Sequence, residues 1–519
     1  MTEVTVGLRI LDTLTSSLYE DPIVIFREYV QNSLDSKIRS IKDGKEMDEF
    51  KVTIRVDEEN KTIIIEDNGY AISSDAFERK MTTVSGSDKG FESIGFRGIG
   101  RLSAMPFCKK LVFESKAKGE NAINTCEWNG EKYNDLLNQY AADRIEKHIA
   151  SFMKIGTREN QDTASHFFRV IINEYSSEIE RLVKNQDNFK INLRKFLPLS
   201  YSNTFTKSEQ ILTRYEAMFN RSLSDFMCVV EYNGEYLEKE FEDKLVGESD
   251  LRFLEIKTKN PVNQQTENIG LLWFSFNKQI KANLAWKKKD IFGILVRSKN
   301  MLMGGNTSFA DQALRSDNPF TTYDEMVAAL RGISGELLIY SDRLKDNARR
   351  DWFRVDAESL LLRNIVADFL ERVHDYRYAM SEYLRATDTE GVKERGATEA
   401  LTKLLSSNYE EVCDKFFKEP DAPKGKKKKK PKEEEEDVTL SEKDIPHENS
   451  INKNFYDQLM TIIKEFMIAN GEYTLFNKLR AHIKEQFERG GSDGKNNPGG
   501  AGISEQIPSD RTDEDCDIS

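Results

Sequence analysis

The stretch of residues 26–36 restricts most strongly what this chain can fold into. Placed on a helix at roughly 100° per residue, the apolar residues here and just beyond form one stripe, made of Phe26, Val30, Leu34 and Ile38. Glu28, Asn32 and Asp35 form a second stripe, spread over about 60°. The residues therefore predict a helix with one apolar side and one side that carries two carboxylates and an amide.

The polar stripe has the chemistry of a magnesium and water site. Mg²⁺ prefers oxygen ligands, takes few of them from protein, and completes its shell with water and phosphate. Asn32 can supply one such oxygen, and Glu28, one turn away, can orient or deprotonate a water molecule. For this stretch alone, the alternative is an amphipathic surface helix with an ordinary polar face.

Composition limits the class of protein. The 519 residues suffice for roughly two or three domains, and a net charge of −13 gives no general basic footprint for nucleic acid. The five cysteines and five histidines are dispersed without a Cys-x-x-Cys pair, which argues against a structural zinc site. The cysteine usage, and the lack of a signal-peptide pattern or a long apolar run, predict a cytoplasmic protein that is not inserted in a membrane.

A helix and a hairpin are expected near the start of the chain. The helix covers residues 21–41, with Asp21 as its N-cap and Pro22 at its first helical position. Alternating apolar residues predict strands over residues 51–57 and 62–66, joined by a turn.

The second of these strands runs directly into the tripeptide Asp67-Asn68-Gly69. A carboxylate at the end of a buried strand can lie at the floor of a cleft and accept a hydrogen bond from the amino group of a purine. Taken alone, the tripeptide is also a common turn. A short helix over residues 73–84 is expected next, followed at residues 85–90 by a polar segment with the composition of a mobile lid.

Gly95, Gly98 and Gly100 form the pattern Gly-x-x-Gly-x-Gly ahead of an apolar run that is typical of a helix. Glycines let backbone amides approach phosphate oxygens, and a following helix adds its positive N-terminal end. The pattern lacks the lysine of a P-loop, and no strand precedes it directly as a Rossmann turn needs. The three glycines are therefore a separate candidate for phosphate binding.

In this order and spacing, the polar helix stripe, the Asp67-Asn68-Gly69 turn and the three glycines resemble the GHKL ATPases. That superfamily includes gyrase B, the ninety-kilodalton heat-shock chaperones, histidine kinases and MutL. The resemblance implies a Bergerat fold, an α/β sandwich in which ATP lies between helices and a mixed sheet. It also implies Mg²⁺ as the ion that accompanies ATP.

The resemblance implies roles for individual residues. Glu28 corresponds to the base that activates water, and Asn32 corresponds to the Mg²⁺ ligand. Asp67, followed by Gly69, corresponds to the residue that reads adenine, and Asp35 lies in reach of the nucleotide. The three glycines correspond to the hinge of the lid, which contacts the phosphates.

One position departs from the chaperone pattern. The chaperones usually carry Asp-x-Gly-x-Gly at the adenine turn, and here Ala71 replaces the second glycine. A Cβ at this position restricts the turn. We expect nucleotide binding to be kept nonetheless.

Two residues are candidates for the remaining position in the nucleotide site. The family's sheet usually ends in a Gly-Thr pair followed by a strand, with the threonine near the phosphates, and Gly156-Thr157 fits this in composition. The strand expected over residues 167–172 starts ten residues later, however, and Ser165 lies closer to it. We assign Thr157 to the site and keep Ser165 as the alternative. Residues 120–150 are expected to be an insertion with a helix.

A second, α+β domain is expected after the first. Strands are predicted over residues 226–232, 253–256, 270–276, 291–297 and 336–340, with a helix over residues 322–331. Residues 335–373 resemble the middle domain of the heat-shock chaperones, where a strand, a loop with an Asn-x-x-Arg-acid pattern and a long helix follow one another.

In that family the loop arginine reaches back to the γ-phosphate when the lid closes. The segment Asn347-Ala348-Arg349-Arg350-Asp351 puts Arg350 at this position, with Arg349 beside it. A cation there would stabilise the charge that develops on the phosphoryl oxygens. The alternative is that these arginines pair with Asp342 and Asp351 on the surface. Weaker candidates for the same cleft are Arg297 and Lys299.

We therefore expect an α+β multidomain protein. The expected parts are a GHKL ATP-binding domain over residues 1–190, a middle or transducer-like α+β domain with terminal helices over 195–418, a charged low-complexity linker over 419–450, a helical C-terminal module over 451–490 and a disordered tail over 491–519.

The function expected from the resemblance is that of an ATP-dependent clamp similar to the heat-shock chaperones. ATP would drive lid closure and homodimerisation around a protein client or partner, as in a bacterial stress or defence system. The alternative is a MutL- or MORC-like DNA-associated ATPase, which the three lysines at residues 287–289 keep open although the net charge argues against nucleic acid. A sensor histidine kinase is a weaker alternative, because the first histidine is His148 and none precedes the ATP motifs.

Overall fold

The computed structural model describes residues 21–44, 49–83, 100–140, 145–243, 251–259, 265–276, 292–305, 307–316, 323–330, 333–347, 349–385 and 392–405. The chain divides into two compact units, Met1–Lys424 and Gly425–Ser519, and the second unit lies outside the described residues. Several features expected from the sequence also lie outside them: the lid at 85–90, Gly95 and Gly98, the lysines at 287–289, the linker, the helical C-terminal module and the tail.

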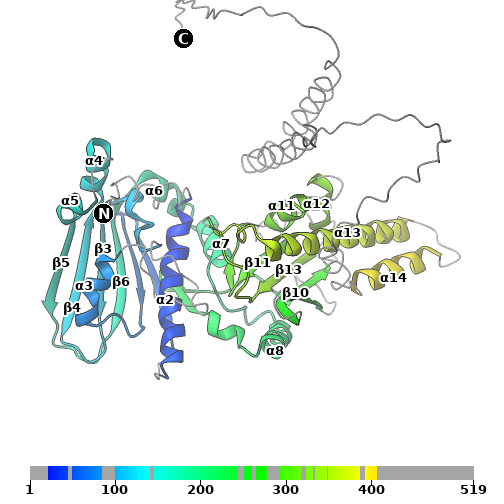
Figure 1. Cartoon of the computed structure of the whole chain (residues 1–519), viewed down its shortest axis with the longest axis horizontal. Coiled ribbons are helices and arrows are strands. Elements are labelled where there is room, and N and C mark those ends of the chain that lie inside the picture. Colours follow the sequence, from blue (N-terminus) through cyan, green and yellow to red (C-terminus); the bar gives the residue numbers. More distant parts are fainter. Residues whose placement is uncertain are drawn as a thin grey trace, which may run out of the picture. The chain divides into compact units, whose positions relative to one another are not determined.

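Among the described residues, the first sheet has eight strands in the order β5-β4-β3-β6-β2-β1-β7-β8 (Figure 1). The strands are β1 (Lys51–Asp57), β2 (Thr62–Asp67), β3 (Cys108–Lys116), β4 (Ala122–Asn129), β5 (Met153–Glu159), β6 (Phe167–Tyr175), β7 (Val229–Tyr232) and β8 (Glu235–Leu237). Neighbouring strands are antiparallel, except that β1 and β7 are parallel. Strands β7 and β8 join this sheet from beyond residue 190, and the residue limits of the domains stay predictions.

The helix and the hairpin expected near the start of the chain are confirmed. Helix α2 spans Ile23–Lys42, and β1 and β2 pair as a hairpin. The Asp21 carboxylate accepts a hydrogen bond of 3.0 Å from the Ile23 amide, which satisfies one of the free donors at the start of the helix. The short helix after the hairpin is also present, as α3 (Ser74–Thr82).

The segment expected to be an insertion is instead partly a strand of the sheet. It holds β4, followed by α4 (Gly130–Tyr140) and α5 (Ile145–Phe152), and β4 pairs with both β3 and β5. The sequence does not predict β4, because Asn124 and Thr125 interrupt its apolar alternation. The remaining helices of this part are α6 (Ser177–Lys184), α7 (Gln186–Phe196) and α8 (Ser208–Phe219).

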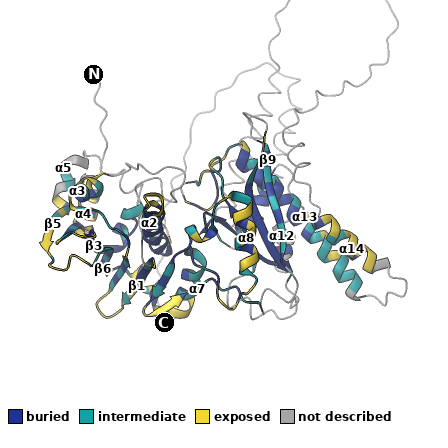
Figure 2. Ribbon diagram, turned by 90° about the horizontal axis from the view of Figure 1, so that it is seen from below, coloured by how far each residue is buried: buried dark blue, intermediate teal, exposed yellow. Residues whose placement is uncertain are grey.

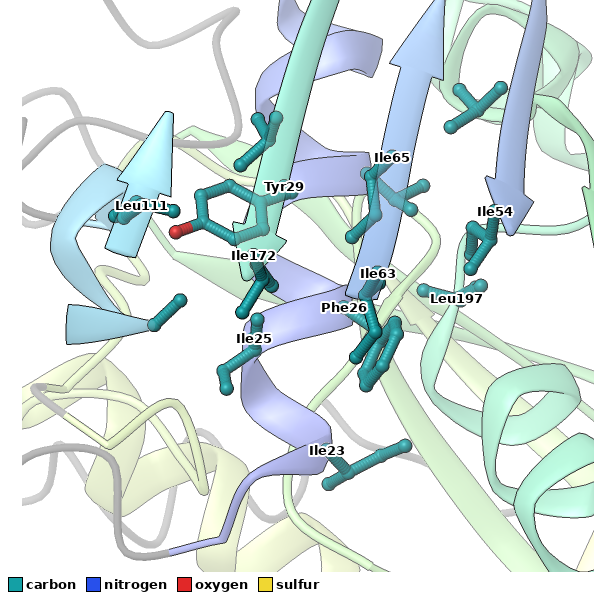
Figure 3. Packing of buried hydrophobic residues seen from close by; sticks show 14 of the residues in the cluster. Ile23, Ile25, Phe26, Tyr29, Ile54, Ile63, Ile65, Leu111, Ile172 and Leu197 are labelled. Carbon is teal, nitrogen blue, oxygen red and sulfur yellow. The ribbon is translucent and has the colours of Figure 1, made fainter. Parts of the chain in front are cut away.

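Helix α2 packs its apolar stripe on the first sheet. Figure 3 shows side chains of α2 facing residues of the sheet, among them Ile25, Phe26, Tyr29, Ile54, Ile63, Ile65 and Ile172. Phe26 also meets Phe189 of α7 edge to face, with ring centroids 4.9 Å apart. Full burial of each such side chain contributes about 1.5–3 kcal/mol, so this stripe fixes α2 on the sheet.

The opposite side of α2 is buried as well. Figure 2 shows α2 mostly in the colour of buried residues, and its buried positions include Arg27, Glu28, Gln31, Ser33 and Asp35. The alternative of an ordinary surface helix is therefore wrong. A buried polar side needs partners, because leaving polar groups unpaired away from water is unfavourable.

The second part of the chain is the expected α+β arrangement, except that the strand predicted for it over residues 226–232 is β7, which pairs with β1 in the first sheet. Among the described residues the sheet of this second part has five strands in the order β12-β11-β13-β10-β9. The elements are β9 (Arg252–Lys259), β10 (Thr266–Phe276), β11 (Gly293–Ser298), β12 (Met301–Leu302), β13 (Ile333–Ile339), α11 (Ser308–Leu314), α12 (Tyr323–Leu330), α13 (Ala357–Arg385) and α14 (Val392–Leu405). Phe369 of α13 packs against Phe274 of β10, with ring centroids 5.2 Å apart. No described helix is long and apolar enough to span a membrane.

A buried polar cluster joins this second sheet to the segment that follows β8. At its centre Glu336 of β13 is 0% exposed, and it accepts hydrogen bonds from Tyr201 (2.5 Å), Lys239 (3.2 Å) and Trp273 (3.3 Å). Arg297 of β11 donates to the same carboxylate through Nε. Burial alone would raise the pKa of Glu336, but the charges of Lys239 and Arg297 outweigh burial and hold the pKa below its usual value.

We predict that Glu336→Gln lowers the free energy of unfolding by about 3–5 kcal/mol, because it leaves the Arg297 guanidinium buried without a counter-charge. Lys239→Met is the matched control. Burial lowers the pKa of Lys239, while the charge of Glu336 acts in the opposite direction. Loss of Lys239 leaves Glu336 paired with Arg297 and should therefore cost only about 1–3 kcal/mol, in line with a hydrogen bond to a charged group.

Urea denaturation of both variants near pH 8 measures the two costs. Equal losses in the two variants would show that Glu336 is not the centre of the cluster.

Candidate functional site

Helix α2 carries the polar stripe into the interior. Glu28 is 5% exposed and Asp35 is 3% exposed, while Asn32 between them is half-buried. These three side chains are thus held by a helix that the apolar stripe fixes on the sheet. A site built on such a helix keeps its geometry better than one built on a loop.

The Glu28 carboxylate is closely surrounded. Its Oε1 lies 3.4 Å from Arg27 Nη2 and 3.6 Å from Arg350 Nη1. On the other side, a Cβ added to Gly100 would lie only 2.3 Å from Glu28 Oε2. Only a glycine therefore fits at position 100 while Glu28 keeps this conformation. The neighbouring Tyr29 hydroxyl donates to the Arg101 carbonyl at 2.8 Å, which ties this segment to α2.

The Asp67 carboxylate lies at the end of β2 and is 2% exposed. Its Oδ2 accepts a hydrogen bond from Ser33 Oγ at 2.7 Å, and its Oδ1 accepts one from the Gly69 amide at 3.0 Å. Burial raises the pKa of Asp67 to about 6, although the hydrogen bonds from Ser33 and Gly69 act in the opposite direction. The group therefore changes charge in the weakly acidic range.

The three sequence motifs meet along α2. Glu28 touches Gly100, and one and a half turns further on Ser33 contacts Asp67. A Cβ added to Gly69 would lie 3.1 Å from Ser36 Oγ, so the turn after β2 also presses on this helix. Sequence reasoning did not single out Ser33, because it lies about 100° away from Asn32 and off the polar stripe. Only the position of β2 beside α2 reveals its role.

The turn that follows Asp67 is strained. Ala71, which replaces the second glycine of the chaperone pattern, has φ +62°, in the left-handed region. This region costs a residue with a Cβ about 1–2 kcal/mol. The departure noted in the sequence therefore restricts the turn as expected, and the surrounding structure must hold Ala71 in place.

Thr157 and Ser165, the two candidates for the last site residue, lie in different places. Thr157 is on the edge strand β5, where its hydroxyl donates to Asn124 Oδ1 at 3.0 Å. Strands β4, β3 and β6 separate it from β2, a distance of roughly 19 Å at the usual strand spacing. The structure therefore does not bring Thr157 to Asp67. Ser165 directly precedes His166, whose Nδ1 lies 2.9 Å from the Gly69 carbonyl oxygen, so its segment borders the turn.

Arg350 reaches the site from the loop between β13 and α13. It is 6% exposed, its Nη1 lies 3.6 Å from Glu28 Oε1, and its Nε lies 3.9 Å from Asp346 Oδ2. Its own φ is +56°, and its carbonyl oxygen accepts a hydrogen bond of 3.1 Å from the Gly304 amide. A surface pairing of Arg350 with Asp342 or Asp351 is therefore not the observed arrangement.

Of the two weaker cation candidates, Arg297 is bound elsewhere. Arg297 is part of the Glu336 cluster, so it is not available to the cleft beside Glu28. Lys299 is 9% exposed and lies in the turn after β11, where its amide donates to the Ile339 carbonyl at 3.1 Å.

The donor set fits a metal that comes with a phosphate ligand. Within the described ranges there is no group of three or more His, Cys, Asp or Glu side chains that could hold a metal ion. The half-buried Asn32 lies on the same helix face as Glu28 and Asp35. One amide oxygen suits Mg²⁺ when nucleotide phosphates and water supply the other ligands.

Comparison with known proteins gives one family. Residues 21–161 match the family described as histidine kinase-, DNA gyrase B-, and HSP90-like ATPase. This range contains α2, the Asp67 turn and Gly100.

Longer alignments are found with proteins named chaperone protein HtpG. The one from Fusobacterium nucleatum subsp. nucleatum is 20% identical over 582 aligned positions, which cover 92% of this chain and 92% of that protein. The one from Enterobacter sp. is 27% identical over 247 positions, which cover 42% of this chain and only 39% of that protein. The ATPase and transducer domains of DNA topoisomerase II from Balamuthia mandrillaris align with a TM-score of 0.38 and 10% identity, over 69% of this chain and 86% of that chain.

We predict that ATP affinity falls as the pH drops below about 6, since protonation of Asp67 removes the charged acceptor that the family resemblance assigns to the adenine amino group. The sign follows from the raised pKa, because the carboxylate is ionised above about 6 and neutral below it. In Ser33→Ala the ionised form loses a hydrogen bond, so the pKa should rise and the affinity should fall at a higher pH than in the wild type.

Calorimetric titrations between about pH 5 and 8 measure this dependence. Ser40→Ala, on the same helix, removes a hydroxyl that donates to the Ser36 carbonyl oxygen; it is the control and should keep the wild-type midpoint. A constant affinity over this range would contradict the role of Asp67.

Proposed function

Because residues 21–161 form an ATPase domain of the GHKL superfamily, we propose that the chain is an ATP-dependent molecular clamp whose second domain completes the ATPase site. In this proposal Glu28 activates the attacking water, and Arg350 stabilises the charge that develops on the γ-phosphate.

The observation that carries the proposal is the approach of Arg350 to Glu28. Glu28 lies on helix α2, which packs on the first sheet, and Arg350 lies in the loop that follows β13 of the second sheet; both side chains are buried, and their charged atoms lie 3.6 Å apart. At this distance the contact is an ion pair rather than a good hydrogen bond, so another anion can compete with Glu28 for the guanidinium. A γ-phosphate beside Glu28 would be such an anion, and a fork of donors suits its oxygens.

The backbone of Arg350 supports the same conclusion. A left-handed φ at a non-glycine residue is unfavourable, and such residues gather where function requires a fixed geometry. The hydrogen bond from Gly304 and the contact with Asp346 hold the loop in this form. A pre-positioned arginine loses little freedom when phosphate arrives, which is how fixed charges accelerate phosphoryl transfer.

Glu28 and Asn32 would divide the remaining chemistry. Glu28 is close enough to its neighbours to be held in one orientation, and a positioned carboxylate can take a proton from water. Asn32 would hold Mg²⁺ together with the phosphates of ATP, and the ion would neutralise part of their charge. Asp67 would bind the adenine amino group from the other end of the cleft.

The similarity to chaperone protein HtpG, over 92% of both chains, supports a chaperone-like clamp. We therefore propose that ATP binding favours a homodimer that encloses a protein client or partner in the cytoplasm. The alternative of a DNA-associated ATPase rests on the lysines at residues 287–289, outside the described ranges, and no observation on the described residues favours it.

Arg350→Ala should slow ATP turnover roughly tenfold or more, while the affinity for ATP stays close to that of the wild type, because the arginine acts mainly on the transition state. Arg350→Lys keeps the positive charge but lacks the paired donors of the planar guanidinium. Its turnover rate should therefore lie between those of the wild type and Arg350→Ala. The matched control is Arg349→Ala, which removes the neighbouring, exposed arginine and should have a much smaller effect.

Steady-state turnover and nucleotide binding of these three variants test the proposal. Wild-type turnover in Arg350→Ala, or equal losses in Arg349→Ala, would show that Arg350 does not serve the reaction.

Glu28→Gln should bind ATP but hydrolyse it at least about tenfold more slowly, since a positioned base contributes about 10²–10⁴-fold. Asn32→Ala should instead lose the dependence of nucleotide binding on Mg²⁺. Binding assays with and without Mg²⁺, together with turnover measurements, separate the two roles. A Glu28→Gln variant that hydrolyses ATP at the wild-type rate would mean that another residue is the base.

A further inference from the structure

The strained turn after Asp67 is held from both sides by side chains that no sequence motif singles out. Before Ala71, His166 Nδ1 lies 2.9 Å from the Gly69 carbonyl oxygen. After Ala71, Ser115 Oγ accepts a hydrogen bond from the Ile72 amide and donates one to the Ile72 carbonyl, both at 2.8 Å. The left-handed residue thus lies between two fixed points of the backbone.

Both side chains are held by strands of the sheet, one within a strand and the other directly before one. Ser115 is 0% exposed on β3, and His166 directly precedes β6, which pairs with β2 so that Phe168 lies opposite Asp67. The turn is therefore anchored to β3 through Ser115 and to the start of β6 through His166. The ring of His166 is also stacked on Tyr70, with centroids 6.0 Å apart and planes inclined by 12°.

We propose that His166 and Ser115 are positioning residues that hold the Ala71 turn in the form that binds the nucleotide base, and that His166 thereby sets the affinity for ATP. The inference rests on the proposed role of Asp67 in base binding. It concerns the end of the site remote from Glu28 and Arg350.

The turn can act on the base because it carries a partner of Asp67. The Gly69 amide donates to Asp67 Oδ1, and its carbonyl oxygen accepts from His166. The peptide groups that flank Gly69 therefore link the histidine to the carboxylate. Gly69 also lies close to Ser36 of α2, so a shift of the turn would change the space between Asp67 and the helix.

The contact requires a donor on the histidine. A carbonyl oxygen only accepts, so Nδ1 must carry the proton, and it carries one in the imidazolium as well. The hydrogen bond therefore survives protonation of the ring. The neighbouring charged groups are Asp67 and Lys118, whose Nζ lies 5.7 Å from the centre of the Tyr70 ring. A charged His166 also lowers the pKa of Asp67, so the variants are compared well above a pH of about 6, where Asp67 is ionised and the geometric role of His166 is isolated.

Substitutions at position 166 test the contact. His166→Ala should raise the dissociation constant for ATP about threefold to tenfold, the effect of one hydrogen bond, with turnover at saturating ATP within about twofold of the wild type. His166→Asn can place an amide donor near the position of Nδ1 and should restore most of the affinity. His166→Gln, whose amide lies one methylene further from the backbone, should not restore the affinity. Ser115→Ala should weaken ATP binding in the same manner.

A second measurement needs no nucleotide. If His166 restrains a strained residue, Ala71→Gly should raise the melting temperature less in the His166→Ala background than in the wild type, because the turn can already relax there without the histidine. The double variant should also bind ATP more tightly than His166→Ala alone.

Two results would overturn the inference: an unchanged affinity in His166→Ala, or strictly additive effects of the two substitutions on both melting temperature and affinity. These outcomes are distinct from a failure of the clamp proposal, which would appear as normal turnover in Arg350→Ala.

Discussion

The burial of α2 on both sides is the constraint on which the rest of the site depends. Its apolar stripe packs on the sheet, so its polar stripe has a fixed position before any ligand binds. Buried polar groups need partners, and here the partners are supplied by the two loop motifs and by the second domain. Glu28 meets Gly100 and Arg350, and Ser33 meets Asp67. One helix thereby sets the spacing between Asp67 and Glu28, the residues proposed to bind the base and to activate water.

The second domain contributes through its own buried anchor. The Glu336 cluster locks β13 to β10 and β11 and to the segment after β8, so the strand that leads into the Arg350 loop is held at its centre. The loop itself is held where the Gly304 amide donates a hydrogen bond to the Arg350 carbonyl oxygen. Since β7 and β8 belong to the first sheet, the connection between the sheets runs through packed structure rather than through a free linker. This suits a device in which the position of one domain determines hydrolysis in the other.

Local sequence patterns predicted the helices and strands well, but they did not predict which residues far apart in the sequence contact each other. The periodicity of residues 21–41 and the alternation of the hairpin gave α2, β1 and β2, and the resemblance placed Arg350 where it does approach Glu28. Ser33, Ser115 and His166 were missed because their roles arise from strand order and register, which a single sequence does not contain. Thr157 was chosen from its Gly-Thr composition, and it lies on β5, with the three strands β4, β3 and β6 between it and β2.

The central claim is that the second domain supplies a cation to the ATPase site. A crystal structure of the full chain with Mg²⁺ and a non-hydrolysable ATP analogue tests it most directly. The account predicts that Arg350 donates to a γ-phosphate oxygen at about 2.7–2.9 Å, the usual distance for such a charge-assisted bond, and that Glu28 holds a water in line with the phosphorus. A γ-phosphate bound only by residues of the first domain, with Arg350 still paired to Glu28 or turned to solvent, would contradict it.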